Sequence, residues 1–178
     1  MKNIVQILML LAAAAWLTAG CSSDSEPDTE NATIALPAGL ILSAAPAGAP
    51  TTVSEIKANT QVGDEVIVRV VAGGSTESVF MHDRAVVKVV DAALDNPCLA
   101  DDDHCPTPWD YCCTPNDQLL PQQATIKVVD AQNKTLGVSL KVPGRIEELK
   151  TLVVRGVVAP DSNENNLVIN AHGIFVEN

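Results

Sequence analysis

The stretch Glu65-Val66-Ile67-Val68-Arg69-Val70-Val71-Ala72 decides the fold. It follows a turn at Val62-Gly63-Asp64 and stops at Gly73-Gly74. Its β-branched side chains suit the pleated, half-buried surface of a sheet, and the glycine pair after it ends or bulges a strand. We therefore predict a β-strand at residues 65–72, and the rest of the chain is interpreted around it.

Further segments of the same character follow along the chain. Strands are predicted at residues 84–92, 124–130, 135–142, 151–159 and 167–176, with a hairpin across the polar turn at 131–134. Short helical turns are predicted at residues 53–58 and 145–150. This order predicts an all-β fold, a small five- to six-stranded OB-like barrel with one short helix before the last two strands and a cysteine-rich insertion between strands two and three. Closing a barrel removes exposed sheet edges.

Two segments near the ends of this domain carry a resemblance. Gly63-Asp64-Glu65-Val66 opens the first strand, and Leu152-Val153-Val154-Arg155-Gly156-Val157-Val158 precedes the final strand, which ends near Gly173-Ile174. The pattern resembles OB-fold domains of the tRNA-anticodon-binding type over residues 62–176. The resemblance implies a barrel that binds nucleic acid or oligosaccharide on the face of strands two and three.

The overall charge argues against a nucleic-acid partner. The 178 residues hold 11 Lys and Arg against 22 Asp and Glu, a net charge of -11, and aromatic residues make up only 3%. Nucleic-acid binders need cations to neutralise phosphate and aromatic rings to stack on bases. Nucleic acid is therefore disfavoured unless a basic face assembles from Arg69, Arg84, Lys88 and Lys127.

The N-terminus predicts export and a lipid anchor. Lys2 precedes the apolar run Ile4 to Leu17, which is too short to span a membrane and is typical of a signal peptide at residues 1–20. Leu17-Thr18-Ala19-Gly20-Cys21 resembles the lipobox of bacterial lipoproteins. That resemblance implies cleavage before Cys21, acylation of Cys21 as the contact with the lipid membrane, and placement on the periplasmic face of the outer membrane. The alternative is an ordinary secretory signal with Cys21 as a spare thiol.

After the anchor, residues 21–50 are rich in Ser, Asp, Glu, Pro, Ala and Gly, which predicts a flexible tether. The apolar patch Gly39-Leu40-Ile41-Leu42 is expected either to dock on the domain or to add an edge strand. Residues 51–178 are assigned to the OB-like domain, and residues 91–121 to its insertion. The chain is also similar to a group of bacterial lipoproteins through the stretch Cys105-Pro106-Thr107-Pro108-Trp109-Asp110-Tyr111-Cys112-Cys113.

The insertion at 91–121 holds every cysteine other than Cys21. An exported protein meets an oxidising compartment, so the default expectation is two disulfides among Cys98, Cys105, Cys112 and Cys113. A bond between the neighbours Cys112 and Cys113 would be strained. Cys98 then pairs with Cys112 and Cys105 with Cys113, or the pairing is crossed, and both possibilities stay open.

A metal or redox site is the alternative use of these cysteines. They and His104 offer soft ligands, but the Cys-Xaa2-Cys spacing of structural zinc sites is missing. Adjacent Cys112 and Cys113 would not easily share one tetrahedral ion, so no metal and no cofactor are expected.

Trp109, Tyr111 and His104 are candidate binding residues, although the two aromatic rings could instead plug the base of the loop. No catalytic constellation is visible, so we expect a non-enzymatic binding or structural module for an envelope protein or another ligand. Nucleic-acid or oligosaccharide binding, and a metal or redox role for the cysteines, are the alternatives.

Overall fold

The computed structural model describes residues 35–76, 78–100, 105–163 and 165–177. The predicted signal peptide at 1–20, the predicted lipidation site Cys21 and the start of the tether lie outside the described residues. One helix, α1 (Val53–Asn59), precedes the first of five strands: β1 (Glu65–Ala72), β2 (Val86–Asp91), β3 (Gln123–Lys127), β4 (Thr151–Val158) and β5 (Leu167–Val176). Within the described ranges, no helix has the length and apolar character needed to cross a bilayer.

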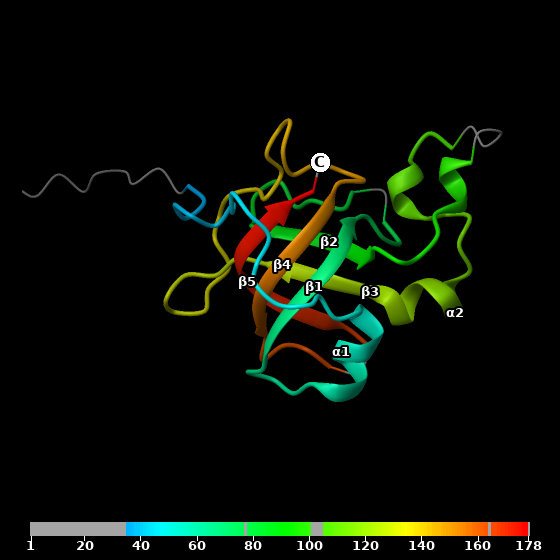
Figure 1. Cartoon of the computed structure of the whole chain (residues 1–178). Coiled ribbons are helices and arrows are strands. Elements are labelled where there is room, and N and C mark those ends of the chain that lie inside the picture. Colours follow the sequence, from blue (N-terminus) through cyan, green and yellow to red (C-terminus); the bar gives the residue numbers. More distant parts are fainter. Residues whose placement is uncertain (1–34, 77, 101–104, 164, 178) are drawn as a thin grey trace, which may run out of the picture. The chain divides into compact units, whose positions relative to one another are not determined.

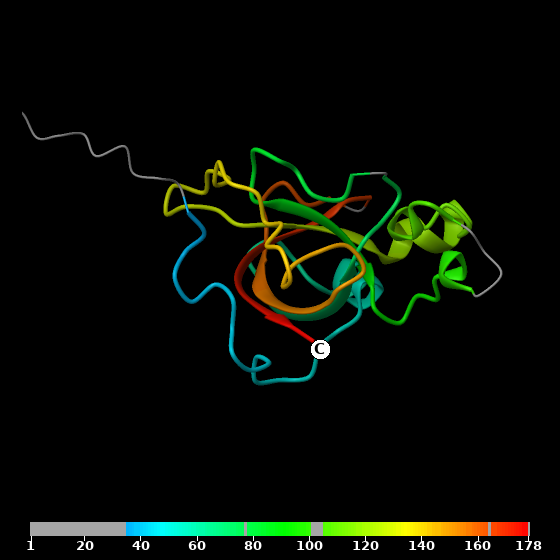
Figure 2. The same cartoon turned by 90° about the horizontal axis from the view of Figure 1, so that it is seen from above.

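The five strands close into a barrel in the order β1-β2-β3-β5-β4 (Figures 1 and 2). β3 and β5 run parallel, and the other neighbouring pairs run antiparallel. Closure pairs the main chain of every strand on both sides, which removes the edges that an open sheet would expose. The predicted all-β, OB-like barrel is confirmed, with the cysteine-rich insertion between β2 and β3.

The core follows from the alternation of buried side chains along the strands. In β1 every second residue from Val66 to Ala72 points inward and is buried. Ile126, Ile169 and Ile174 from β3 and β5 are fully buried in the same interior. Helix α1 adds Val53 and Ile56 to this core, so its apolar face packs against the barrel. The predicted helical turn at 53–58 is confirmed, with Thr52 and Glu55 forming a capping box.

The chain between β3 and β4 differs from the prediction. The predicted strand at 135–142 does not form. The predicted turn at 131–134 does reverse the chain, but only one antiparallel bridge, Val129 to Thr135, follows it, and Val142 bridges to Ile146. Leu136 instead accepts a backbone hydrogen bond from Ala85 in the β1–β2 connection. The predicted helix at 145–150 is also wrong. Residues 145–150 form turns. Leu149 has a left-handed φ of 64°, which is incompatible with an α-helix.

Residues 35–51, most of which the sequence placed in the tether, lie against the barrel. Leu40 is buried, and Ile41 forms a parallel bridge with Ile174 of β5. The amide of Leu42 donates to the Ile174 carbonyl at 2.8 Å, and the amide of Thr51 donates to the Ile67 carbonyl at 2.8 Å. The apolar patch at 39–42 therefore docks on β5, and the folded unit includes this segment.

A buried carboxylate at the end of β2 fixes α1 to the barrel. Asp91 is 4% exposed, and its two oxygens accept hydrogen bonds from the amides of Val53 (2.7 Å) and Ala93 (2.9 Å).

Replacing Asp91 by alanine leaves both amides without this acceptor. We expect unfolding in urea to require about 2 kcal/mol less free energy. The matched variant Asp95→Ala, at an exposed position of the same insertion, is expected to change stability by less than about 0.5 kcal/mol. Equal effects of the two variants would contradict this role of Asp91.

Candidate thiol site

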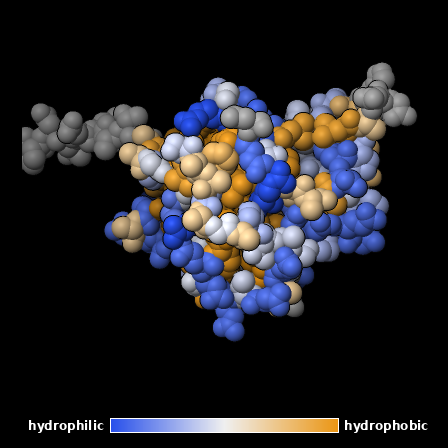
Figure 3. All heavy atoms as spheres, in the orientation of Figure 1, coloured by the Kyte–Doolittle hydropathy of each residue, from blue (hydrophilic) through white to orange (hydrophobic). Residues whose placement is uncertain are grey.

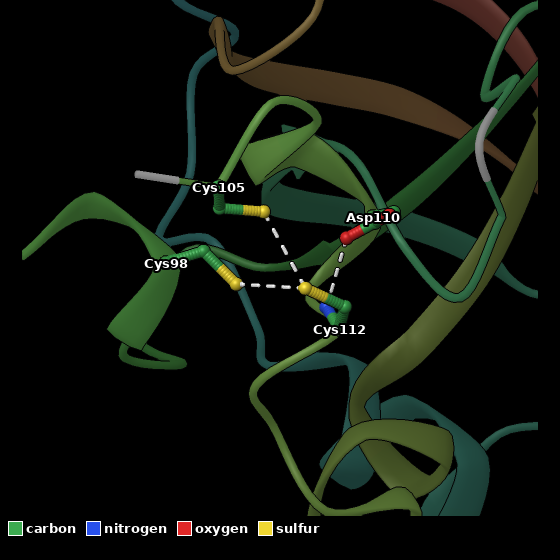
Figure 4. A group of neighbouring side chains, drawn as sticks. All are labelled: Cys98, Cys105, Asp110 and Cys112. Atoms are coloured by element: carbon green, nitrogen blue, oxygen red, sulfur yellow. Dashed lines mark hydrogen bonds between the residues drawn. The ribbon is translucent and has the colours of Figure 1, made fainter. Parts of the chain in front are cut away.

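The insertion brings the sulfurs of its four cysteines together. Figure 4 shows three of them, those of Cys98, Cys105 and Cys112. Cys112 lies at the centre. Its Sγ is 3.4 Å from Cys105 Sγ, 3.5 Å from Cys98 Sγ and 3.7 Å from Cys113 Sγ. A disulfide requires about 2.05 Å, so these are contacts between unbonded sulfurs. Neither of the expected disulfide pairings is formed among these described residues.

Two short 3-10 helices, η1 (Pro97–Leu99) and η2 (Pro108–Asp110), hold this arrangement. Asn96 caps η1, because its Oδ1 accepts from the Cys98 amide at 3.1 Å. Its amide nitrogen donates to the Pro108 carbonyl at 2.8 Å, which ties η1 to η2. Cys98 is only 3% exposed, and the Cys113 amide donates to its sulfur at 3.4 Å. The site thus joins a buried thiol to the exposed Cys112.

Asp110 is a candidate ligand that the sequence analysis did not single out. One of its oxygens accepts from the Cys112 amide at 2.9 Å, and the other from the Thr107 hydroxyl at 2.8 Å. Ligand atoms of Cys98, Cys105, Asp110 and Cys112 all lie within 4.8 Å of one another. The turn that an Asp forms with the amide two residues ahead is the signal that could have identified it.

Electrostatics favour a negative charge on Asp110 and on Cys98. Burial raises the pKa of Asp110, but the hydrogen bonds from Thr107 and Cys112 outweigh burial and hold that pKa below its ordinary value. Burial likewise opposes ionisation of Cys98, and hydrogen bonds, first from Cys113 and then from Cys112 and Cys105, hold the pKa of Cys98 below its ordinary value. The pKa of Cys112 is raised, chiefly by its hydrogen bond to Cys105. Hydrogen bonding in the cluster therefore favours ionisation of Cys98 and disfavours ionisation of Cys112.

Tyr111 turns the chain between Asp110 and Cys112. Its φ of 55° lies in the left-handed region, which a bulky side chain rarely adopts. The ring is 2% exposed and packs with Val90 and Leu119, and this burial holds the strained backbone in place. Burial also raises the pKa of Tyr111 to about 12.

The aromatic residues of the insertion pack inward. Tyr111 is buried, so its ring is not part of an exposed recognition patch. Trp109 is half-buried and packs against the barrel core. Both rings fit the alternative that they plug the base of the loop. His104, the third candidate binding residue, lies outside the described residues.

Gly73, directly after β1, allows the insertion to pack closely against the barrel. A Cβ at this position would lie 2.8 Å from the Trp109 carbonyl oxygen and 2.9 Å from Cε2 of Tyr111. The next amide, of Gly74, donates to the same carbonyl at 2.9 Å. The absence of a side chain at residue 73 thus lets the backbone before Tyr111 approach the barrel.

A Gly73→Ala variant is expected to displace the insertion and leave the barrel folded, because a close backbone contact cannot relax by a rotamer change. The measurement is the rate at which Cys98 reacts with a thiol-specific alkylating reagent, read by peptide mass spectrometry. We expect the rate to rise about tenfold, since opening of the loop exposes the buried thiol. Ser78→Ala, in the same β1–β2 connection, should leave it unchanged. An unchanged rate in Gly73→Ala would show that Gly73 does not position the site.

Two of the four cations named for a basic face are paired with carboxylates. Arg69 is paired with Glu177 at 2.6 Å, and Lys127 with Asp161 at 2.7 Å. Carboxylates beside these cations lower the positive potential that a phosphate would meet. Figure 3 shows hydrophilic side chains over much of one face of the molecule, interrupted by apolar groups.

Comparison with known proteins gives no match to a family model, a curated protein or a solved structure. The chemistry of the thiol cluster is therefore the basis for a functional proposal.

Proposed function

We propose that this protein is a membrane-anchored lipoprotein of the bacterial cell envelope, whose OB-like barrel presents a thiolate site for a soft metal ion, best suited to Zn²⁺. The spacing of the sulfurs carries the proposal. Zn²⁺ binds cysteine sulfur at about 2.3 Å, and tetrahedral geometry then separates two such sulfurs by about 3.8 Å. The distances of 3.4 and 3.5 Å from Cys112 to its partners Cys105 and Cys98 are close to that value.

Cys98, Cys105 and Cys112 would supply three thiolates, and an oxygen of the Asp110 carboxylate lies within 4.8 Å of their sulfurs. Cys113 supports the site by donating its amide to Cys98. The sequence pattern argued against zinc, because the neighbours Cys112 and Cys113 would not fit easily around one ion. That objection does not apply when Cys112 is a ligand and Cys113 orients Cys98. Three protein ligands with an exchangeable fourth position are typical of open zinc sites.

The competing fate of these thiols is oxidation to two disulfides, which the oxidising envelope favours. A bound ion would oppose oxidation by occupying the thiolates. The test is titration of the reduced, full-length protein with Zn²⁺ against a chromophoric chelator. We expect about one tightly bound ion per chain, with protons released as the thiols become thiolates. Failure of the reduced protein to compete with the chelator would contradict the proposal.

The anchor is tested separately. If Cys21 is acylated, inhibition of signal peptidase II by globomycin should accumulate the uncleaved precursor, and Cys21→Ser should move the protein from the membrane fraction to the soluble fraction. Loss of the acyl chains removes about 0.8 kcal/mol for each methylene that they bury in the bilayer. Cys113→Ser, which keeps Cys21, is the matched control and should stay with the membrane. Unchanged processing and fractionation would contradict the lipoprotein assignment.

A further inference from the structure

A polar pocket of about 320 Å³ lies beside the thiol cluster. Asp110 and Cys112 belong to both the pocket wall and the cluster. A molecule in the pocket can therefore reach an ion bound to Cys112. The other polar side chains on the wall come from the β1–β2 connection and from the chain after the cysteines: Ser75, Thr76, Thr114 and Asn116.

Thr114 belongs to the pocket wall and carries a buried hydroxyl. The residue is 7% exposed, and its Oγ1 has no hydrogen-bond partner within the part of the chain that the structure describes. A buried hydroxyl loses its hydrogen bonds to water, so leaving it without a partner is costly. The oxygen is closed off from solvent, so a ligand in the pocket bonds to it and removes that cost only when the pocket wall moves.

The lining selects the charge and size of the ligand. Among the described residues that line it, Asp110 is the one carboxylate, and none is Lys, Arg or His. Such a wall favours an ammonium group and disfavours a carboxylate or phosphate. The volume lies at the lower end of the range of ligand pockets, so a small molecule fits with room for water. The soft ion inferred for the cluster prefers sulfur as an additional ligand.

We propose that this pocket binds a small aminothiol, whose sulfur occupies the exchangeable coordination position of the ion and whose ammonium group lies near Asp110. On binding, the thiol gives its proton to solvent, a metal–sulfur bond forms and the water or carboxylate oxygen in that position leaves. No oxidation or reduction takes place. The inference rests on the proposed function, since it requires an ion held by Cys98, Cys105 and Cys112.

The test uses full-length protein loaded with Co²⁺, whose visible absorption reports the ligands of the ion. Cysteamine carries a thiol and an ammonium, 2-mercaptoethanol a thiol without charge, mercaptoacetate a thiol and a carboxylate, and ethanolamine no thiol. We expect a saturable spectral change with cysteamine, about tenfold weaker binding of mercaptoacetate, 2-mercaptoethanol between them, and no change with ethanolamine. Gel filtration should show that Co²⁺ stays with the protein.

Thr114→Val should weaken cysteamine binding about tenfold without changing Co²⁺ uptake, because it removes only the hydroxyl. Thr125→Val, on β3 outside the pocket, is the matched control. The ligand series on the unaltered protein decides the question if Thr114→Val does not fold. Absence of Co²⁺ uptake would contradict the proposed function itself. Uptake with a spectrum that cysteamine leaves unchanged, equal binding of all three thiols, or loss of Co²⁺ to the added thiol would overturn this inference alone.

Discussion

Cys112→Ser is expected to abolish metal binding, whereas Cys113→Ser is expected to retain it. The two residues are adjacent and both exposed, but only Cys112 lies at the centre of the cluster, with its sulfur in contact with those of Cys105, Cys98 and Cys113. A serine hydroxyl is a poor ligand for a soft ion, so removing the central thiolate leaves only the sulfurs of Cys98 and Cys105 from the proposed set of three.

The measurement is the zinc content of the two reduced variants after gel filtration. We expect about one ion per chain for Cys113→Ser and nearly none for Cys112→Ser, with both barrels folded by circular dichroism. The pair also separates metal binding from disulfide formation. If the four cysteines serve as two disulfides, each variant breaks one bond, and the two should show similar losses of stability and no difference in zinc.

Gly156→Ala is expected to destabilise the barrel severely. Gly156 lies in β4 where the pairing with β5 shifts register, between Arg155 and Gly156. A Cβ there would lie 2.5 Å from the carbonyl oxygen of Asn170 and 2.6 Å from a methyl of Ile169. The clash is with backbone, so one strand must move. β4 also pairs with β1, and β5 with β3, so the displacement passes to both neighbours in the closed barrel.

The free energy of unfolding in urea is expected to fall by about 3 kcal/mol in Gly156→Ala. Gly144→Ala is the control, because nothing lies within 4 Å of its Cβ and only its positive φ of 72° opposes the substitution. That variant should lose about 1 kcal/mol. Equal losses would show that the close approach of β4 and β5 at Gly156 does not limit stability.

The strands were predictable where the sequence alternates or is densely β-branched. β1 lies at residues 65–72 as predicted, because its inward valines sit at every second position. The segment at 135–142 failed for the opposite reason. Leu140 is buried in the core, but Gly137 and the turn at Pro143-Gly144 flank it. The backbone bonds of Leu136 are divided between Val128, inside the predicted hairpin, and Ala85, outside it. Single apolar residues that each pack into the core can give a segment the composition of a strand, although the segment forms no ladder of backbone hydrogen bonds.

The candidate site was predictable in its residue types and not in its geometry. The sequence identified the four cysteines of one insertion, but the central position of Cys112 depends on two 3-10 helices and on the left-handed Tyr111. The burial of Tyr111 depends on Gly73, which is distant in the chain. The same turn places the Asp110 carboxylate beside the cysteines. These contacts form between segments far apart in sequence, so local patterns carry little information about them.

The most direct test of the thiol site is native mass spectrometry of the protein extracted from its own membrane, with and without alkylation of accessible thiols. The account predicts one population with about one zinc ion per chain, and four alkylated cysteines in the domain once the ion is removed by a chelator. Two disulfides, no metal and no alkylation of Cys98, Cys105, Cys112 or Cys113 without prior reduction would contradict it.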